Sequence, residues 1–96
     1  MIPTTQAIQQ AVCSHFGLTR AEILSPTRER RVARPRQIGM YLTRRLTSRS
    51  LPEIGRAYGG RDHSTVHHAV ATIVAMVNAD ADLVQDIDRI AMELLS

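Results

Sequence analysis

The sequence contains no tryptophan, a single cysteine and only three aromatic residues, Phe16, Tyr41 and Tyr58. One cysteine, Cys13, cannot form a disulfide within the chain, and because it lies in an apolar helical pattern we expect a buried thiol. With so few large rings, the core has to be built from Ala, Ile, Leu, Val and Met, which suits closely packed helices. The 96 residues are enough for one domain, residues 1–96, and for no second module.

The chain also lacks any apolar stretch near the roughly 20 residues that a membrane-spanning helix needs. No basic segment followed by an apolar run opens the sequence, so we expect no secretory leader. Apolar residues make up 44% of the chain, which is too high for a disordered tail and normal for a folded domain. We therefore expect a folded protein without a membrane span that works in the cytoplasm.

Lysine is absent as well, so all 12 basic residues are arginine. Ten of them lie from Arg28 to Arg61 beside only Glu29 and Glu53, which gives this segment a formal charge of +8. From Asp62 onward there are six carboxylates and one arginine. A codon bias could explain the missing lysine but not the clustering. A positive block is typical of a protein that binds a polyanion, and guanidinium groups favour two-point contacts to phosphate or guanine.

Apolar spacing and capping residues predict six helices and no strand. The first helix covers about residues 5–16 and ends at Gly17. Thr19 and Glu22 form a capping box that begins a short second helix. A proline-containing break follows, and with it a basic loop at about residues 26–34.

The third helix is expected to begin near Arg34-Pro35, because proline is tolerated in a first turn. Ser50 and Glu53 form a second capping box, which begins a short fourth helix. Gly59-Gly60 then allows a tight reversal, and Asp62 is a good N-cap for a fifth helix. A sixth, amphipathic helix completes the chain.

The short helix, the glycine turn and the longer helix, over about residues 51–78, make a helix-turn-helix. In this motif the first residues of the second helix meet base edges in the major groove. Here these residues are Asp62, His63, Ser64 and Thr65, with His67 and His68 one turn further on. A carboxylate can accept from a cytosine amino group, hydroxyls can donate or accept, and a threonine methyl can pack on a thymine methyl. The segment predicts a reader of DNA grooves, although helix-glycine-helix patterns also occur in proteins that bind nothing.

Three segments, the last of which contains the start of this second helix, lie in a defined order along the chain. They are Val32-Ala33-Arg34-Pro35-Arg36-Gln37, Ser50-Leu51-Pro52-Glu53-Ile54-Gly55 and Gly59-Gly60-Arg61-Asp62-His63-Ser64-Thr65-Val66-His67-His68-Ala69-Val70. Together they resemble the bacterial chromosomal replication initiator family, DnaA, over about residues 5–95. The resemblance implies the family's C-terminal DNA-binding domain: an all-α, compact bundle with a helix-turn-helix similar to that of Trp repressor, reading a short asymmetric site, the DnaA box.

Carried over by position, the resemblance implies DNA contacts from four places. The major groove would be read by Asp62, His63, Ser64, Thr65 and His68. The basic loop would insert Arg28 into the adjacent minor groove, with Arg30 beside it. Phosphates would be held by Arg36, Gln37, Arg44 and the helix start at Leu51-Pro52.

Two positions depart from the family pattern. Ser64 stands where the family usually has threonine, and His67 stands where it usually has leucine or another apolar residue. Both lie at the reading end of the helix, so these are the positions at which this chain can prefer a different site.

The family's full-length protein also carries an ATPase module. This chain has no G-x-x-x-x-G-K-[ST] segment and no room for the module, so we expect no ATP site and no cofactor. The chain is then either an excised domain or a free-standing one. We expect it to bind DNA as a monomer, with self-association as the open alternative.

Metal binding and catalysis have little support in the sequence. His63 and His67 have the spacing of a helical zinc pair, but the glutamate of H-E-x-x-H is missing, and Cys13 and His15 supply no second half. Ser64 has histidines nearby but no sign of an oriented base and an oxyanion site. We therefore expect a chain that is not an enzyme and that holds no metal.

Two functions remain as hypotheses. The first is sequence-specific binding of double-stranded DNA at DnaA-box-like sites in origins or promoters, beside the nucleoid and linked to replication initiation or its regulation. The alternative is a free-standing regulatory or protein-interaction module that competes with the initiator or contacts it. The acidic C-terminal end is the only feature that favours the alternative.

Overall fold

A computed structural model describes residues 2–95, and within this range the chain forms six helices and no strand. The helices are α1 (Thr5–Phe16), α2 (Arg20–Leu24), α3 (Arg30–Leu46), α4 (Leu51–Ala57), α5 (His63–Val77) and α6 (Ala81–Leu95). The predicted all-helical bundle of about six helices is confirmed. None of these described helices is long and apolar enough to cross a membrane.

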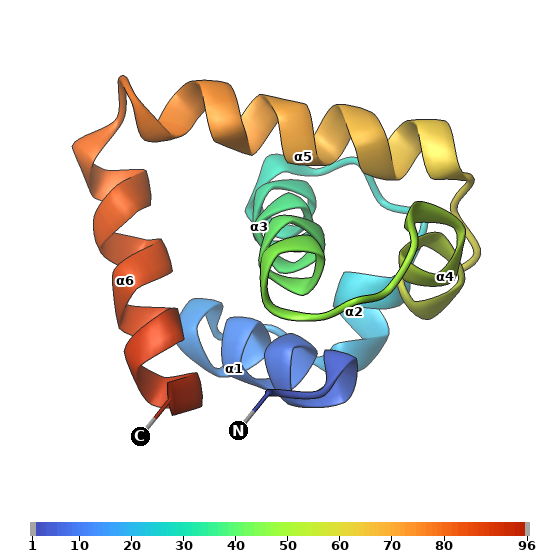
Figure 1. The fold of residues 1–96 in the computed structure, drawn as a ribbon, viewed down its shortest axis with the longest axis horizontal. Coiled ribbons are helices and arrows are strands. Elements are labelled where there is room, and N and C mark those ends of the chain that lie inside the picture. The colour runs from blue at the N-terminus through green and yellow to red at the C-terminus, as the bar shows by residue number, and fades with distance from the viewer. Residues whose placement is uncertain (1, 96) are drawn as a thin grey trace.

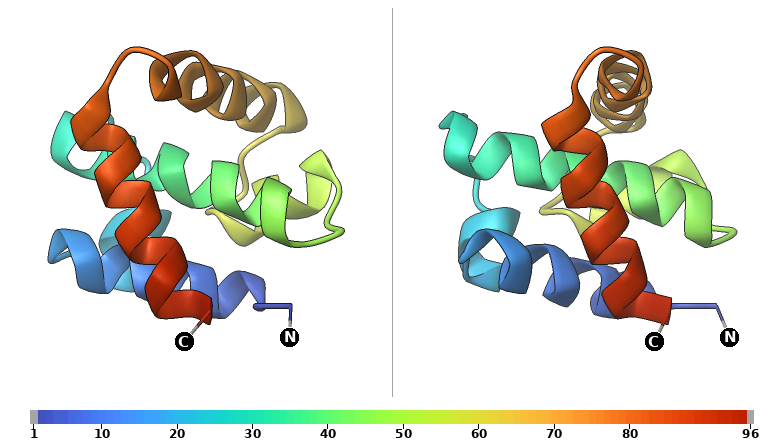
Figure 2. Two further views of the ribbon diagram at one scale, coloured as in Figure 1. Left: turned by 60° about the vertical axis from the view of Figure 1, so that its left-hand side comes forward. Right: turned by 90° about the vertical axis from the view of Figure 1, so that its left-hand side faces the viewer.

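Helix α3 runs through the middle of the domain, and the other helices surround it (Figure 1). α5 crosses one side of α3, α1 crosses the opposite side, and α6 spans the edge between α5 and α1 (Figures 1 and 2). α3 contacts α1, α2, α4 and α5. This central position lets one helix support both halves of the helix-turn-helix and the loop that precedes it.

Short polar side chains begin the helices as the sequence predicts. Both capping boxes are formed: the Thr19 and Ser50 hydroxyls accept from the backbone three residues on, and Glu22 and Glu53 return the contact. These backbone hydrogen bonds lower the pKa of both glutamates. Asp62 caps α5 by its side chain alone, which accepts from the Thr65 amide. Each helix that shapes the helix-turn-helix thus begins at a residue fixed by local chemistry.

The helix-turn-helix has a small core of its own. It consists of Met40 from α3 together with Ile54, Tyr58, Val66 and Ala69. The Tyr58 side chain is fully buried, and its hydroxyl lies 3.0 Å from the Thr43 hydroxyl, which in turn donates to the Gly39 carbonyl at 2.8 Å. Burial raises the pKa of Tyr58, so the phenol stays protonated. This pair fixes the end of α4 against the middle of α3.

The prediction that the third helix begins near Arg34-Pro35 is wrong by about one turn. α3 begins at Arg30, and the Glu29 carbonyl accepts from the Val32 amide at 2.9 Å. Pro35 therefore lies inside the helix, where it removes one backbone hydrogen bond. Val32 is only 1% exposed, so the additional turn buries an apolar side chain that offsets this loss. The predicted basic loop ends at residue 29, and residues 30–34 are helical.

Candidate nucleic-acid interface

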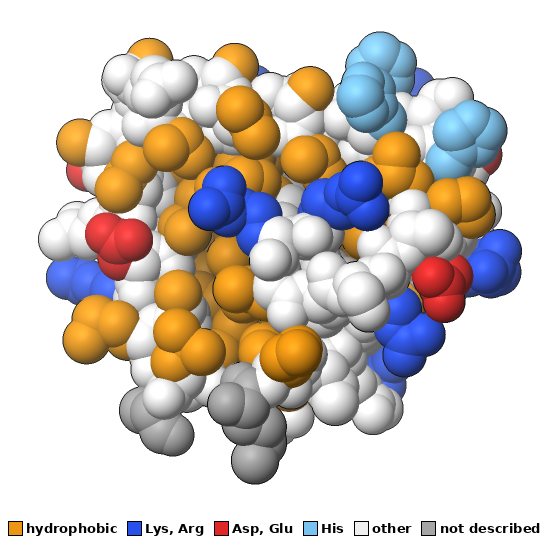
Figure 3. Space-filling model, viewed as in Figure 1, with side chains coloured by type: hydrophobic (Ala, Val, Ile, Leu, Met, Phe, Trp, Pro, Cys, Tyr) orange, Lys and Arg blue, Asp and Glu red, His pale blue; other side chains and the backbone are white. Residues whose placement is uncertain are grey.

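The first turns of α5 form an exposed, polar surface of the helix-turn-helix. All six residues predicted to read DNA here are exposed: Asp62, His63, Ser64, Thr65, His67 and His68. Histidine side chains stand out from the surface over the start of α5 (Figure 3). The His67 and His68 rings face each other edge to face, with centroids 6.0 Å apart. Such a helix end can present donors and acceptors to a groove without first unfolding or exposing core.

The N-cap of α5 orients this surface. One carboxylate oxygen of Asp62 accepts from the Thr65 backbone amide at 2.9 Å. That bond is the main reason why the pKa of the Asp62 carboxyl lies below its ordinary value. The carboxylate is therefore ionised at neutral pH, and it adds a negative acceptor to the exposed start of α5.

Two adjacent surface grooves run beside the start of α5. The larger has a volume of about 570 Å³ and is lined by Leu24, Pro26, Thr27, Arg28, Arg36, Gly59, Gly60, Arg61 and Thr65. The smaller, of about 270 Å³, is lined by Ala33, Arg36, Gln37, Met40, Arg61, Thr65, His68, Ala69 and Thr72. Arg36, Arg61 and Thr65 line both. The grooves bring the basic loop, the middle of α3 and the recognition helix onto one continuous face.

Arg28 and Arg30 lie at the entrance to α3. Both are exposed, and Arg28 lines the larger groove, whereas Arg30 is the first residue of α3 and lines neither groove. Gln37 lies about two turns along α3 in the smaller groove, where its amide oxygen accepts from the Arg34 guanidinium at 2.9 Å. Arg28, the loop arginine that is predicted to enter a minor groove, thus lies along the same surface groove as Thr65.

Arg36 is placed differently from the other predicted phosphate contacts. It is 6% exposed, and its guanidinium donates to the backbone carbonyls of Ile23 at 2.7 Å, Thr27 at 3.0 Å and Ser25 at 2.8 Å. Burial, and then the charge of Arg61, lower its pKa. This geometry favours a role in holding the loop over a direct contact with phosphate.

Arg44, Leu51 and Pro52 lie where α3 ends and α4 begins, and they line neither groove. Arg44 and Pro52 are exposed and Leu51 is half-buried. The Arg44 guanidinium lies 3.3 Å from the Arg49 carbonyl. These residues form a second polar edge of the helix-turn-helix, separate from the grooves.

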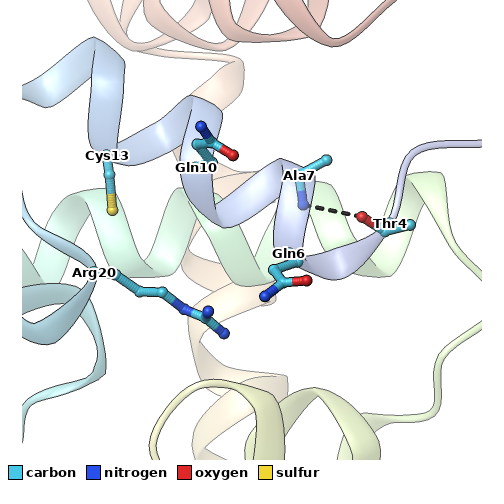
Figure 4. A pocket seen from close by; sticks show the side chains of 6 residues that line it. All are labelled: Thr4, Gln6, Ala7, Gln10, Cys13 and Arg20. Atoms are coloured by element: carbon cyan, nitrogen blue, oxygen red, sulfur yellow. Dashed lines mark hydrogen bonds between the residues drawn. The ribbon is translucent and has the colours of Figure 1, made fainter.

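Metal-ligating side chains and the Cys13 thiol are the remaining candidates for a chemical site. No group of three or more His, Cys, Asp or Glu side chains within residues 2–95 is placed to hold a metal ion. Cys13 is buried, as predicted, and burial raises the pKa of its thiol. It lies at the back of a surface hollow of about 470 Å³ between α1 and α2, where the Arg20 side chain reaches across toward Gln6 (Figure 4). This hollow shares no lining residue with the two grooves.

Arg61 is the interface residue that the sequence did not single out. It is half-buried, lines both grooves and donates to the carbonyls of Tyr58 and, at 2.6 Å, Ser25. Its charge was visible in the basic segment. Its partner at residue 25 lies 36 positions away, and no spacing pattern joins the two.

Comparison with known proteins identifies relatives of this chain. Residues 5–73 match the family described as bacterial dnaA protein helix-turn-helix. The chain is 54% identical over 93 residues to the chromosomal replication initiator protein DnaA of Sphingopyxis alaskensis, covering 97% of this chain and 20% of that protein. It is 48% identical over 91 residues to the DnaA of Caulobacter vibrioides (95% and 19%) and 52% identical over 89 residues to that of Xanthobacter autotrophicus (90% and 18%). The chain spans about a fifth of the length of these relatives.

Proposed function

The chain belongs to the bacterial DnaA helix-turn-helix family, a family of DNA-binding domains, and on this premise we propose that it binds double-stranded DNA sequence-specifically at DnaA-box-like sites. The observation that carries the proposal is the exposed polar start of α5 beside two arginine-lined grooves. The domain has no catalytic task of its own in this proposal. It supplies the DNA contact on which replication initiation, or its regulation, depends.

The proposed contacts divide by the groove that they reach. The start of α5 enters the major groove, where Asp62, Ser64 and Thr65 meet base edges and the histidines meet bases or phosphates. Arg28 enters the neighbouring minor groove. Arg30, Gln37, Arg44 and the start of α4 at Leu51-Pro52 lie along the phosphate backbone on either side. Ser64 and His67 are both exposed, so a site preference different from the usual box would arise there.

Binding curves for a DnaA-box duplex and a scrambled duplex of equal composition test the proposal. We expect the box to bind at least about a hundredfold more tightly, since specific binding exceeds non-specific binding by factors of roughly 10³ or more in most systems. Affinity should fall with salt by about 0.9 log unit per log unit for each phosphate neutralised. Equal affinity for both duplexes at moderate salt would overturn the sequence-specific proposal.

Thr65→Ala should weaken binding to the preferred duplex by about 1–3 kcal/mol and leave binding to scrambled DNA nearly unchanged. The substitution removes the hydroxyl and methyl but keeps the backbone amide that Asp62 caps, so α5 still begins at the same residue. Fluorescence anisotropy with both duplexes measures the difference. Ser14→Ala, at an exposed position of α1, is the matched control and should change neither affinity.

The regulatory alternative draws on the charge of α6. Asp82 and Asp88 are exposed on this helix, as are the apolar side chains of Met92 and Leu95. Asp88, Met92 and Leu95 lie on one face of this helix. A module that contacts the initiator through this face would retain the initiator on a column carrying the domain, and Asp88→Lys would reduce the retention. The same substitution would leave DNA binding by α5 intact.

A further inference from the structure

Two guanidinium groups, that of the buried Arg36 and that of the half-buried Arg61, join the helix-turn-helix to the segment of residues 25–29 between α2 and α3, which we call the anchored loop. The Ser25 carbonyl accepts from Arg36 at 2.8 Å and from Arg61 at 2.6 Å. Arg36 belongs to α3 and Arg61 to the turn before α5. A single loop carbonyl therefore receives donors from both the central helix and the turn of the motif.

We call the place where the anchored loop meets α3 and the turn of the motif the junction. Each arginine also donates to a second segment of the backbone at this junction. Arg36 donates to the carbonyls of Ile23 and Thr27, so it spans the end of α2 and the middle of the anchored loop. Arg61 donates to the Tyr58 carbonyl at the end of α4. The two side chains together connect α2, the anchored loop, α3 and the turn of the motif.

The backbone of the turn also packs closely against the end of α2 at this junction. Gly59 has a positive φ of 91°, and a Cβ there would overlap the Leu24 carbonyl oxygen and crowd the Arg61 guanidinium. Only glycine combines this backbone conformation with so close an approach. The turn is therefore seated directly against the end of α2, and the Arg61 side chain fills the space that a larger residue would need.

Neither guanidinium has a carboxylate partner among the ion pairs of the described residues. Every hydrogen bond that these two groups make among the described residues goes to a backbone carbonyl, which is a neutral acceptor. Moving these two positive charges out of water costs free energy, and no ion pair with a carboxylate offsets that cost. The hydrogen bonds that the two groups make hold several segments of the backbone in one arrangement.

We propose that Arg61 is a positioning residue which, together with Arg36, fixes the anchored loop relative to the recognition helix and so sets the spacing between the minor-groove and major-groove contacts. The proposal rests on the proposed function. Arg28 on the loop and Thr65 on α5 line the same groove, and Arg36 and Arg61 line it with them. If the junction loosens, Thr65 still reaches the major groove, but Arg28 no longer meets the minor groove at a fixed base pair.

Arg61→Met and Arg61→Lys test the proposal. Met keeps the length of the side chain without donors, and Lys keeps the charge with a single donor group. Arg31→Met is the matched control, because Arg31 is an exposed arginine near the same loop. Its ion pairs with Glu22 and with Glu29 of the loop are surface pairs, which contribute little to holding the backbone. Circular dichroism at increasing temperature first establishes that each variant is folded.

The first readout is amide hydrogen exchange in the free protein. We expect Arg61→Met to raise the exchange rates of the Ser25, Val32 and Ala33 amides at least about tenfold, with amides in α1 and α6 unchanged. These three amides donate to the Glu22 and Glu29 carbonyls at the two ends of the anchored loop, so they lose protection when the loop loosens. Arg61→Lys should give a smaller rise and Arg31→Met none. Unchanged exchange at the loop in Arg61→Met would overturn the anchoring role.

The second readout separates the two DNA grooves. Each A·T pair of the bound duplex is replaced in turn by G·C, which adds an amino group to the minor groove, or by inosine·C, which does not. At the pair read by Arg28, wild type and Arg31→Met should bind inosine·C about tenfold better than G·C, whereas Arg61→Met should bind both alike. Discrimination at pairs read by α5 should survive in all variants.

The outcomes distinguish the two proposals. A wild-type protein that discriminates at neither groove would overturn the proposed function and this one with it. An Arg61→Met variant that retains the wild-type preference at the minor-groove pair would overturn the positioning role alone. Loss of discrimination at both grooves together would also overturn it, since that result indicates general loss of the DNA-binding surface.

Discussion

Gly55→Ala should lower the melting temperature of the domain by about 15 °C, which corresponds to about 3 kcal/mol for a domain of this size. Helix propensity predicts the opposite, because alanine in a helix is favoured over glycine by about 1 kcal/mol. Gly55 lies in α4, however, and a Cβ there would overlap the carbonyl oxygen of Arg61. The Gly55 carbonyl also accepts from the amides of Gly60 at 3.1 Å and Arg61 at 2.9 Å. Because the clashing atom belongs to the backbone, no side-chain rotation can relieve it, and the turn has to move.

Gly17→Ala is the control for this prediction. Gly17 also has a positive φ, at 67°, but a Cβ there meets nothing within 4 Å. Its substitution should therefore show only the left-handed backbone strain of about 1 kcal/mol. Thermal unfolding followed by circular dichroism measures both variants. A Gly55→Ala variant as stable as wild type would mean that the turn does not pack against α4 as closely as the structure has it.

The helix boundaries that depend on neighbouring residues were predictable from the sequence. Thr19 with Glu22, Ser50 with Glu53 and the lone Asp62 begin their helices through bonds that span three residues. Such contacts join residues that are close together in the sequence, so they hardly depend on the rest of the fold. The same reasoning placed the reading residues at the start of α5, and the structure leaves all of them exposed.

The start of α3 was missed because tertiary burial decides it. Pro35 indicated a first turn, and nothing local favours continuing the helix back to Arg30. Val32 becomes buried only because other helices surround α3. Propensity is a weak guide where the packing of the whole domain supplies the free energy.

The role of the buried arginines was missed for a related reason. A cluster of arginines in the sequence indicates a charged surface, and most of them are indeed exposed. Whether one of them turns inward depends on which carbonyls the fold brings within reach. The carbonyls that receive Arg36 belong to residues 9 to 13 positions away, and the Arg61 partner at Ser25 lies still further off. Neither a motif nor an amphipathic pattern contains that information.

Arg36→Met should destabilise the domain by about 3 kcal/mol. The substitution removes three hydrogen bonds from a charged donor, each worth about 1.5–3 kcal/mol in isolation. Several effects reduce the sum. Arg61 still donates to Ser25, water can reach part of the released carbonyls, and the repulsion between the two guanidinium groups disappears. Methionine fills the space of the aliphatic stem, so the loss reflects the donors and not a cavity.

Urea unfolding at pH 7 and the salt dependence of DNA binding together decide what Arg36 does. If it holds the anchored loop, stability falls as stated, while the slope of log affinity against log salt, measured below the unfolding range, stays close to that of wild type. If it holds a phosphate instead, stability changes by less than about 0.5 kcal/mol and the slope falls by about 0.9. Arg30→Met is the control: Arg30 is exposed at the start of α3, takes part in none of the described ion pairs, and should leave stability unchanged. The change that Arg30→Met causes in the slope of log affinity against log salt shows the effect of losing one surface charge near DNA. The slope of Arg36→Met can then be compared with it directly.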